Sequence, residues 1–303
     1  MASDISEKMR LGLRRAVKGI REFAYNRPPA AREPEPPPSR RRIGLALGGG
    51  FARGLAHIGV LKVLTDNHIS FDALAGVSVG SIIAAAFAGG LPVEEMAART
   101  RTVRWKSFAR WTVGRLGLAT NERMEGLLQE AVHAKRFEDL SIPLAVVATD
   151  LSTGEAVTFR RGELIPPLRA SCSFPGLFIP IEYQGRLLVD GALTAPMPVA
   201  ALQEFGVDTI VAVFLKTNGP RHTPTNIFQV IGQSFQIAQS LNQAPWRDAC
   251  HLVIEPDTTD FDWDDFARAE ELIAAGERAA RQVLPALQAL FEPRPVPRLV
   301  VAR

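Results

Sequence analysis

The chain has 303 residues, of which 47% are apolar, and a formal net charge of +3. This length can bury a full hydrophobic core, while two cysteines, Cys172 and Cys250, are too few for a disulfide framework and suggest a reducing compartment. The first 42 residues hold 11 Lys and Arg against 5 Asp and Glu, which leaves a net −3 on the remaining 261. Because the basicity belongs to the leader, we expect no nucleic-acid partner.

The N-terminal segment predicts a basic amphipathic leader helix over residues 1–25, followed by a Pro-rich charged linker over 26–42. Between residues 5 and 25, apolar side chains recur every three or four positions, and Lys and Arg occupy the other sides. Three arrangements fit: peripheral contact with an anionic membrane surface, docking on the protein's own body, or a partly disordered leader. With no signal peptide and no apolar run long enough to span a bilayer, we expect a cytoplasmic protein, peripheral at the inner membrane surface if the leader binds lipid.

The body, residues 43–292, alternates apolar strands with helices, and a short tail follows at 293–303. We place strands at 43–47, 71–75, 144–149, 156–159, 186–189, 209–213 and 251–254. We place helices at 52–67, 79–89, 225–242 and 263–290, the last kinked or ended at Pro285, with 92–135 largely helical. This order predicts an α/β fold with a mostly parallel sheet covered on both faces.

A G-x-S-x-G sequence, Gly76-Val77-Ser78-Val79-Gly80, lies between the strand at 71–75 and an apolar helix. The pentapeptide alone is weak evidence, but the strand–turn–helix context is typical of a nucleophile elbow. In such a turn the Ser78 hydroxyl stands above the sheet, and the Val79 N–H and the helix N-terminus face a developing oxyanion. The pattern therefore favours a serine hydrolase.

Three glycines, Gly48 to Gly50, follow the first strand and open the next helix. Such a run lets backbone N–H groups approach an anion closely. A dinucleotide loop is disfavoured because Phe51 occupies the middle glycine of a G-x-G-x-x-G that would end at Gly54, and no Gly-Lys-Ser/Thr follows. A turn that only permits tight packing is the other alternative. With an elbow one unit later, an oxyanion hole is favoured.

The general base is ambiguous from the residues alone. Of the five histidines, only His222 and His251 come late enough for the Ser…Asp…His order of α/β-hydrolases, and neither has a supporting motif. Asp190, which ends an apolar strand, is a carboxylate alternative. Asp190-Gly191 between apolar runs is equally a hairpin-turn signal.

Two further segments are compatible with access to lipid. Residues 101–111 interleave basic and aromatic side chains, as interfacial helices do, although a helix packed on the body explains them equally well. Residues 225–242 predict an amphipathic helix that serves as a cover or as a dimer contact, and the oligomeric state is not readable from the sequence.

Five ordered blocks between residues 43 and 290 together resemble the patatin-like phospholipase family, in its bacterial branch related to neuropathy target esterase. The blocks are Gly48-Gly49-Gly50-x-x-Arg53-Gly54 with Ala56-His57-Ile58-Gly59-Val60-Leu61, Gly76-x-Ser78-x-Gly80, Thr149-Asp150-Leu151-x-Thr153-Gly154, Arg169-Ala170-Ser171-x-x-x-Pro175-x-x-Phe178-x-Pro180, and Asp190-Gly191-Ala192. Phe51 departs from the pattern, because relatives usually carry a small residue there.

The resemblance implies a three-layer α/β/α fold and a Ser–Asp dyad that hydrolyses phospholipid, lysophospholipid or related acyl esters without a cofactor or metal. Ser78 would be the nucleophile and Asp190 the general base, which requires an enclosed site that raises the pKa of the aspartate. The implied oxyanion hole comprises Gly48, Gly49, Gly50 and Val79, with Arg53, Gly54, Gly76, Gly80 and Gly191 in support. The rival interpretations are a Ser-His-Asp esterase and a catalytically silent membrane-binding protein.

Overall fold

The computed structural model describes residues 41–292, apart from 113, 217–222, 226 and 242. The predicted leader helix, most of the linker and the tail lie outside the described residues, and these assignments stay predictions. All of the described residues belong to one compact unit, Arg40–Pro293.

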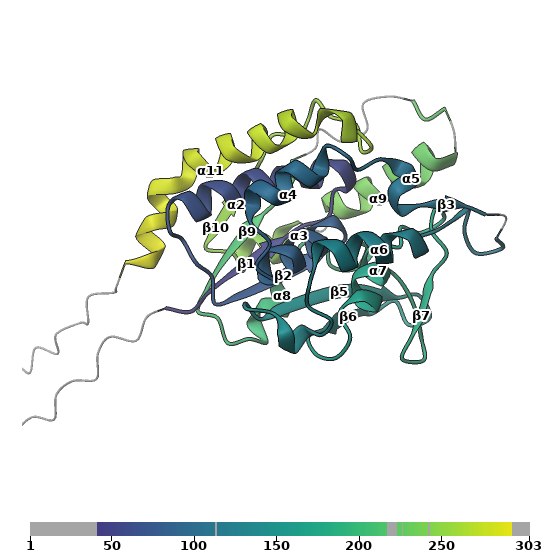
Figure 1. Ribbon diagram of the computed structural model, residues 1–303, viewed down its shortest axis with the longest axis horizontal. Helices are drawn as coiled ribbons and strands as arrows, with labels where there is room; N and C mark the ends of the chain where they lie inside the picture. Colours follow the sequence, from purple (N-terminus) through teal and green to yellow (C-terminus); the bar gives the residue numbers. More distant parts are fainter. Residues whose placement is uncertain (1–40, 113, 217–222, 226, 242, 293–303) are drawn as a thin grey trace, which may run out of the picture. The chain divides into compact units, whose positions relative to one another are not determined.

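The body is built on an eight-stranded mixed sheet with the strand order β10-β9-β1-β2-β5-β8-β7, and β6 pairs with β5 off this path (Figure 1). Strands β10, β9, β1, β2 and β5 are parallel, whereas β6, β7 and β8 pair antiparallel to their neighbours. The strands are β1 (Ile43–Leu47), β2 (Ala73–Val77), β5 (Leu144–Asp150), β6 (Ala156–Phe159), β7 (Ile181–Tyr183), β8 (Arg186–Asp190), β9 (Thr209–Val213) and β10 (Leu252–Ile254). The predicted α/β fold with a mostly parallel sheet is confirmed.

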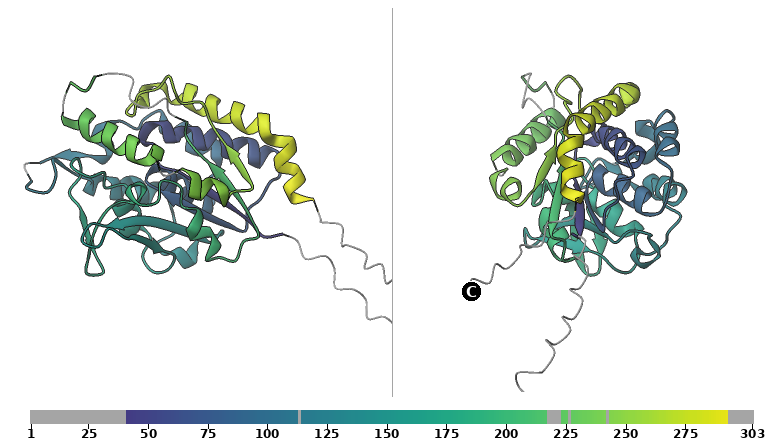
Figure 2. Two further views of the ribbon diagram at one scale, coloured as in Figure 1. Left: turned by 180° about the vertical axis from the view of Figure 1, so that it is seen from behind. Right: turned by 90° about the vertical axis from the view of Figure 1, so that its left-hand side faces the viewer.

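Helices connect the strands and cover the sheet (Figures 1 and 2). The α-helices are α2 (Ala56–Asp66), α3 (Val79–Ala88), α4 (Val93–Thr100), α5 (Trp105–Phe108), α6 (Glu122–Ala131), α7 (Ile165–Ser171), α8 (Val199–Gln203), α9 (Ile227–Leu241), α10 (Ala244–Asp248) and α11 (Ala269–Phe291). Short 3-10 turns are η1 (Phe51–Leu55), η2 (Phe137–Asp139), η3 (Gly191–Leu193) and η4 (Phe266–Arg268). A separate two-stranded hairpin pairs β3 (Arg110–Trp111) with β4 (Ala119–Thr120).

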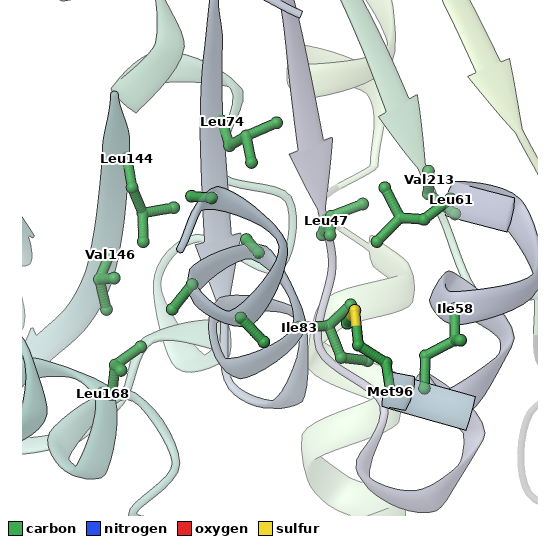
Figure 3. Close-up of a cluster of buried hydrophobic side chains, with 14 of the residues drawn as sticks. Leu47, Ile58, Leu61, Leu74, Ile83, Met96, Leu144, Val146, Leu168 and Val213 are labelled. Carbon is green, nitrogen blue, oxygen red and sulfur yellow. The ribbon is translucent and has the colours of Figure 1, made fainter. Parts of the chain in front are cut away.

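Alternate side chains of the central strands enter two separate hydrophobic clusters, one on each face of the sheet, because successive residues of a strand point to opposite sides. On one face the strand side chains pack against α2, α3, α4 and α7, as Figure 3 shows with Leu47, Leu74, Leu144, Val146, Ile58, Leu61, Ile83, Met96 and Leu168. On the other face the strands contribute smaller side chains, such as Ala46, Ala75 and Ala145. These pack with Met197, with Val199 and Leu202 of α8, and with Trp246 of α10. This is the three-layer arrangement.

The structure corrects several predicted boundaries. Residues 92–135, expected to be largely helical, hold three short helices and the β3–β4 hairpin, so 101–111 is no continuous helix. The second strand starts two residues later than predicted and runs to Val77, which places Gly76 inside it. Helix α11 continues through Pro285 to Phe291, and it bends toward its C-terminal end in Figure 1. Strand β7 was not predicted.

Candidate active site

Strand pairing alone brings the elbow and Asp190 together. Strand β2 pairs with the first half of β5, up to Val77 opposite Val147, and β8 pairs antiparallel with the second half, with Asp190 opposite Ala148. Because β6 pairs with residues 146–149 of β5 on its other edge, β2 and β8 share one edge and meet end to end. Ser78 follows Val77 directly, so this junction sets it beside Asp190.

Ser78 adopts the strained backbone of a nucleophile elbow. Its φ of 52° and ψ of −134° lie where residues other than glycine are rare, and helix α3 starts at the next residue. The Ser171 hydroxyl accepts a hydrogen bond from the Ser78 N–H at 2.8 Å and donates to the Val147 carbonyl at 2.6 Å. The Ser81 hydroxyl donates to the Ser78 carbonyl at 2.6 Å. These buried bonds hold the strained turn in place.

The Ser78 hydroxyl donates to Oδ2 of Asp190 across 2.7 Å. The other carboxylate oxygen, Oδ1, accepts from the Ala192 N–H at 2.9 Å and so caps η3. The Asp190 backbone is held too, because its N–H donates to the Ser173 carbonyl at 2.9 Å and its carbonyl accepts from the Thr149 hydroxyl at 3.0 Å. Asp190 therefore ends a strand and begins a helical turn, and the hairpin-turn alternative is wrong.

Burial governs the electrostatics of this pair. The exposed fractions of Ser78 and Asp190 are 6% and 2%. Desolvation raises the pKa of Asp190 from an ordinary 3.8 to about 7, although the Ala192 N–H and the Ser78 hydroxyl partly oppose the rise by hydrogen bonding to the carboxylate. A carboxyl group with a pKa near neutrality can both accept and return a proton.

The glycine loop lies directly against Ser78. A Cβ added to Gly49 would lie 3.3 Å from the Cβ of Ser78 and 3.3 Å from that of Ala192, so the loop passes close beside the elbow and the Asp190 turn. The Gly48 N–H donates to the Val213 carbonyl at 3.3 Å, which corrects its predicted place among the oxyanion donors. Within the described part of the chain, no protein acceptor is recorded for the N–H groups of Gly49, Gly50 and Val79. Gly49, Gly50 and Val79 are therefore the candidate oxyanion donors.

The remaining predicted glycines are sites of close approach. A Cβ at Gly76 or Gly80 would overlap the backbone of Ser81 or of Leu47, across the elbow. At Gly54 it would overlap Val79, and at Gly191 it would overlap the Val147 carbonyl. Their role is therefore to let the elbow, the glycine loop and the Asp190 turn pack together.

Arg53 and Phe51 flank the glycine loop differently. Arg53 is buried, its Nε has no partner among the described residues, and desolvation lowers its pKa while the charge of Asp262 opposes this. The Phe51 ring packs edge-on into an aromatic cluster at centroid distances of 4.9 Å from Trp263 and 6.5 Å from Phe174. The unexpected Phe51 thus belongs to a packed aromatic wall beside the loop.

The histidines occupy other positions. His251 stands at the start of β10, the amino end of a strand parallel to β2, so it lies at the end of the sheet away from Ser78. It accepts a hydrogen bond from the Ile210 N–H at 3.2 Å, while His222 lies outside the described residues. His57 is fully buried and hydrogen-bonds the Gly48 carbonyl at 2.8 Å through Nε2, and burial lowers its pKa to about 4. No histidine of the described ranges bonds Ser78 or Asp190.

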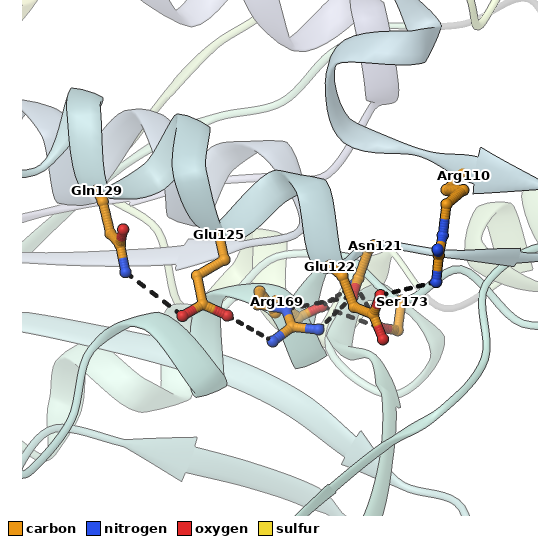
Figure 4. Close-up of polar contacts among 7 residues, drawn as sticks. All are labelled: Arg110, Asn121, Glu122, Glu125, Gln129, Arg169 and Ser173. Atoms are coloured by element: carbon orange, nitrogen blue, oxygen red, sulfur yellow. Dashed lines mark hydrogen bonds and ion pairs between the residues drawn. The ribbon is translucent and has the colours of Figure 1, made fainter.

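A polar network that was not predicted from the sequence lies behind the site (Figure 4). The Asn121 amide donates to the Ser173 hydroxyl at 3.0 Å, and the Arg169 guanidinium donates to Oδ1 of Asn121 and to Glu125. Since the Ser173 carbonyl accepts from the Asp190 N–H, the network supports the loop that holds Asp190. The sequence block that begins Arg169-Ala170-Ser171 pointed to this region, but the sequence alone did not indicate what Arg169 or Ser171 does.

The described residues offer neither a metal site nor a membrane span. Across the described ranges, no group of three or more His, Cys, Asp or Glu side chains is arranged to hold a metal ion. None of the helices in that part of the chain is both long and apolar enough to cross a bilayer.

Comparison with known proteins identifies the family. The chain is 35% identical over 189 residues to an uncharacterized NTE family protein of Mycobacterium tuberculosis, covering 61% of this chain and 52% of the relative. It is 31% identical over 206 residues to lysophospholipase NTE1 of Cryptococcus neoformans, covering 65% of this chain and 13% of the relative. The chain thus spans about half the length of the mycobacterial relative and a much smaller share, 13%, of the fungal one.

A solved structure agrees on the fold. VipD from Legionella pneumophila superimposes with a TM-score of 0.50 at 13% identity, over 82% of this chain and 67% of that one. The family model for patatin-like phospholipase matches residues 45–202, which include the glycine loop, the elbow and Asp190. The chain belongs to the patatin-like phospholipase family.

Proposed function

We propose that residues 43–292 form a serine acyl hydrolase that cleaves phospholipid, lysophospholipid or a related acyl ester through Ser78 and Asp190. The observation that carries the proposal is the 2.7 Å hydrogen bond from the Ser78 hydroxyl to Asp190 in an enclosed elbow. Family membership and the similarity to a fungal protein named lysophospholipase support a lipid acyl ester as the substrate class.

In the proposed reaction, Ser78 Oγ attacks the ester carbonyl carbon and its proton passes to Asp190. The carbonyl oxygen becomes an oxyanion that accepts hydrogen bonds from the N–H groups of Gly49, Gly50 and Val79. Collapse of the tetrahedral intermediate breaks the ester C–O bond, and Asp190 returns the proton to the departing alcohol. Water then attacks the acyl-enzyme with Asp190 again as base, which releases the fatty acid and restores Ser78. These steps call for no cofactor.

The environment of Asp190 supports its role as base. An aspartate with an ordinary pKa of 3.8 takes a serine proton poorly, whereas burial raises this one to about 7. The buried Arg53 adds positive potential beside the glycine loop, where negative charge develops. The two cysteines, both free, support a cytoplasmic location.

Hydrolysis of a short p-nitrophenyl ester, a long one and a lysophospholipid tests the proposal. We expect the wild-type protein to turn over at least one of them, and the Ser78→Ala and Asp190→Asn variants to lose about three orders of magnitude or more while remaining folded. The matched control is His251→Asn, which should retain activity because His251 lies at the other end of the sheet. Absence of wild-type turnover on all three would favour a silent binding protein, and loss in His251→Asn would favour a histidine triad.

A further inference from the structure

Five large apolar side chains are exposed on the β3–β4 hairpin and on the first turns of α9. Their exposed fractions are 60% for Trp111, 61% for Leu116, 40% for Leu118, 61% for Ile227 and 45% for Val230. We call these five residues the apolar rim. Large apolar side chains exposed on neighbouring segments mark an interaction surface more often than isolated ones do.

The hairpin and α9 both contact the segment after α7, residues 172–178, whose Ser173 carbonyl accepts from the Asp190 N–H. The backbone N–H groups of Leu118 and Ala119 donate to the Leu177 carbonyl, so the hairpin is fastened to the segment after α7. From the same segment, the Phe174 ring packs 5.1 Å from the Phe235 ring of α9. Figure 1 shows the hairpin and the start of α9 at the same end of the sheet. The rim therefore adjoins the candidate active site.

The hairpin region is also strongly basic. Residues 101–123 hold six Lys and Arg and a single acid, Glu122, a net charge of +5. All six basic side chains are exposed: Arg101, Arg104, Lys106, Arg110, Arg115 and Arg123. Arg101 pairs with Glu270 and Arg110 with Glu122, whereas no ion pair is recorded among the described residues for the other four. On the other side of this region, Phe108 packs against Phe266, which directly follows Asp264 and Asp265. Because these carboxylates would be repelled by an anionic partner, contact through the hairpin is favoured.

We propose that the apolar rim and the basic residues around it dock the protein on an anionic lipid surface. Trp and Leu side chains beside Lys and Arg match the apolar and charged layers of such a surface. A second copy of the chain would bring like charges together at a basic hairpin. The predicted leader, which belongs to a segment carrying +6, would be repelled in the same way. The inference rests on the proposed function for its purpose, because docking here would present lipid to the adjacent site.

Sedimentation of the full chain with vesicles tests the surface without needing turnover. We expect binding to vesicles of phosphatidylcholine and phosphatidylglycerol in equal parts, and little binding to phosphatidylcholine alone. Each basic residue near an anionic bilayer changes the membrane partition coefficient by roughly fivefold. The double variant Lys106→Glu with Arg115→Glu should therefore lower this coefficient by more than about tenfold. The pair Trp111→Ser and Leu116→Ser should weaken binding similarly. The charge-matched control, Arg278→Glu with Arg281→Glu on α11, should bind like wild type.

Hydrolysis of a short soluble ester by the same variants keeps the two proposals separable. Unchanged ester hydrolysis with lost vesicle binding supports the surface, and an inactive wild type that still binds through the rim would overturn only the proposed function. Tryptophan quenching by brominated lipid gives a second measurement, in which Trp111→Phe should remove most of the quenching seen in wild type. The inference is overturned if wild type does not bind anionic vesicles, or if the hairpin variants bind as well as wild type and the control.

Discussion

Replacing Asp190 by Asn should abolish activity and, at neutral to alkaline pH, stabilise the fold. The side chain is almost isosteric and keeps an oxygen that can accept from the Ala192 N–H. What it loses is a negative charge that burial opposes, and with it the capacity to take the Ser78 proton. Catalysis and stability should therefore change in opposite directions in one variant.

The magnitude follows from the difference between the folded and unfolded pKa values of the aspartate. Burial raises the pKa from 3.8 to about 7, so a rise in pH across this interval ionises the unfolded chain while Asp190 stays protonated in the fold. Stability contributed by the protonated group is complete below 3.8 and is lost as pH rises through about 7. At about 1.4 kcal/mol per pKa unit, the wild type loses at most roughly 4 kcal/mol.

Urea unfolding of wild type and Asp190→Asn between about pH 4 and pH 8 measures this difference. The variant should be close to wild type at the acidic end, and its advantage should grow until about pH 7 and then stay constant. Other titrating groups are common to both proteins and cancel in the comparison. An advantage that does not change with pH, or a variant that is less stable at pH 8, would refute the argument that burial raises the pKa.

Three further outcomes follow from the same geometry. Because the base must be ionised, kcat/KM of wild type should rise with pH and level off above about 7, as an initial-rate pH profile would show; a flat profile down to pH 5 contradicts this. Gly49→Ala puts a methyl group 3.3 Å from the Ser78 Cβ and should lower kcat by about tenfold or more with little change in Tm; a fall in Tm alone would argue against an oxyanion role. Ser171→Ala removes the acceptor of the Ser78 N–H and a donor to the Val147 carbonyl, and should cost about 2 kcal/mol in urea unfolding; unchanged stability would mean that the elbow does not depend on these bonds.

The fold class was predictable because its signals are local. An apolar strand such as β1, the glycine loop after it and the elbow before α3 each carry their pattern within about ten residues, and the structure shows them in that order. The hairpin was not predictable in the same way. Its strands have two residues each, and they form where Gly117 packs against the backbone of Phe178, which is remote in sequence.

Only part of the candidate site was likewise predictable from local sequence. The motifs indicated Ser78 and Asp190, but that their strands meet end to end on β5 depends on sheet pairing that no local pattern contains. The N–H of Gly48 was expected to face an anion, yet it completes the pairing of β1 with β9. Support from Ser171 likewise comes from α7, a helix far from the elbow in sequence.

Mass spectrometry after treatment with a long-chain alkyl fluorophosphonate is the most direct test that Ser78 is the nucleophile and Asp190 its base. The reagent transfers its phosphonyl group to an activated serine oxygen with loss of fluoride. We expect a single adduct, on the peptide that contains Ser78, which is absent from Ser78→Ala and forms far more slowly in Asp190→Asn. An adduct on another residue, or labelling of Asp190→Asn at the wild-type rate, would contradict the assignment of Ser78 as nucleophile and Asp190 as its base.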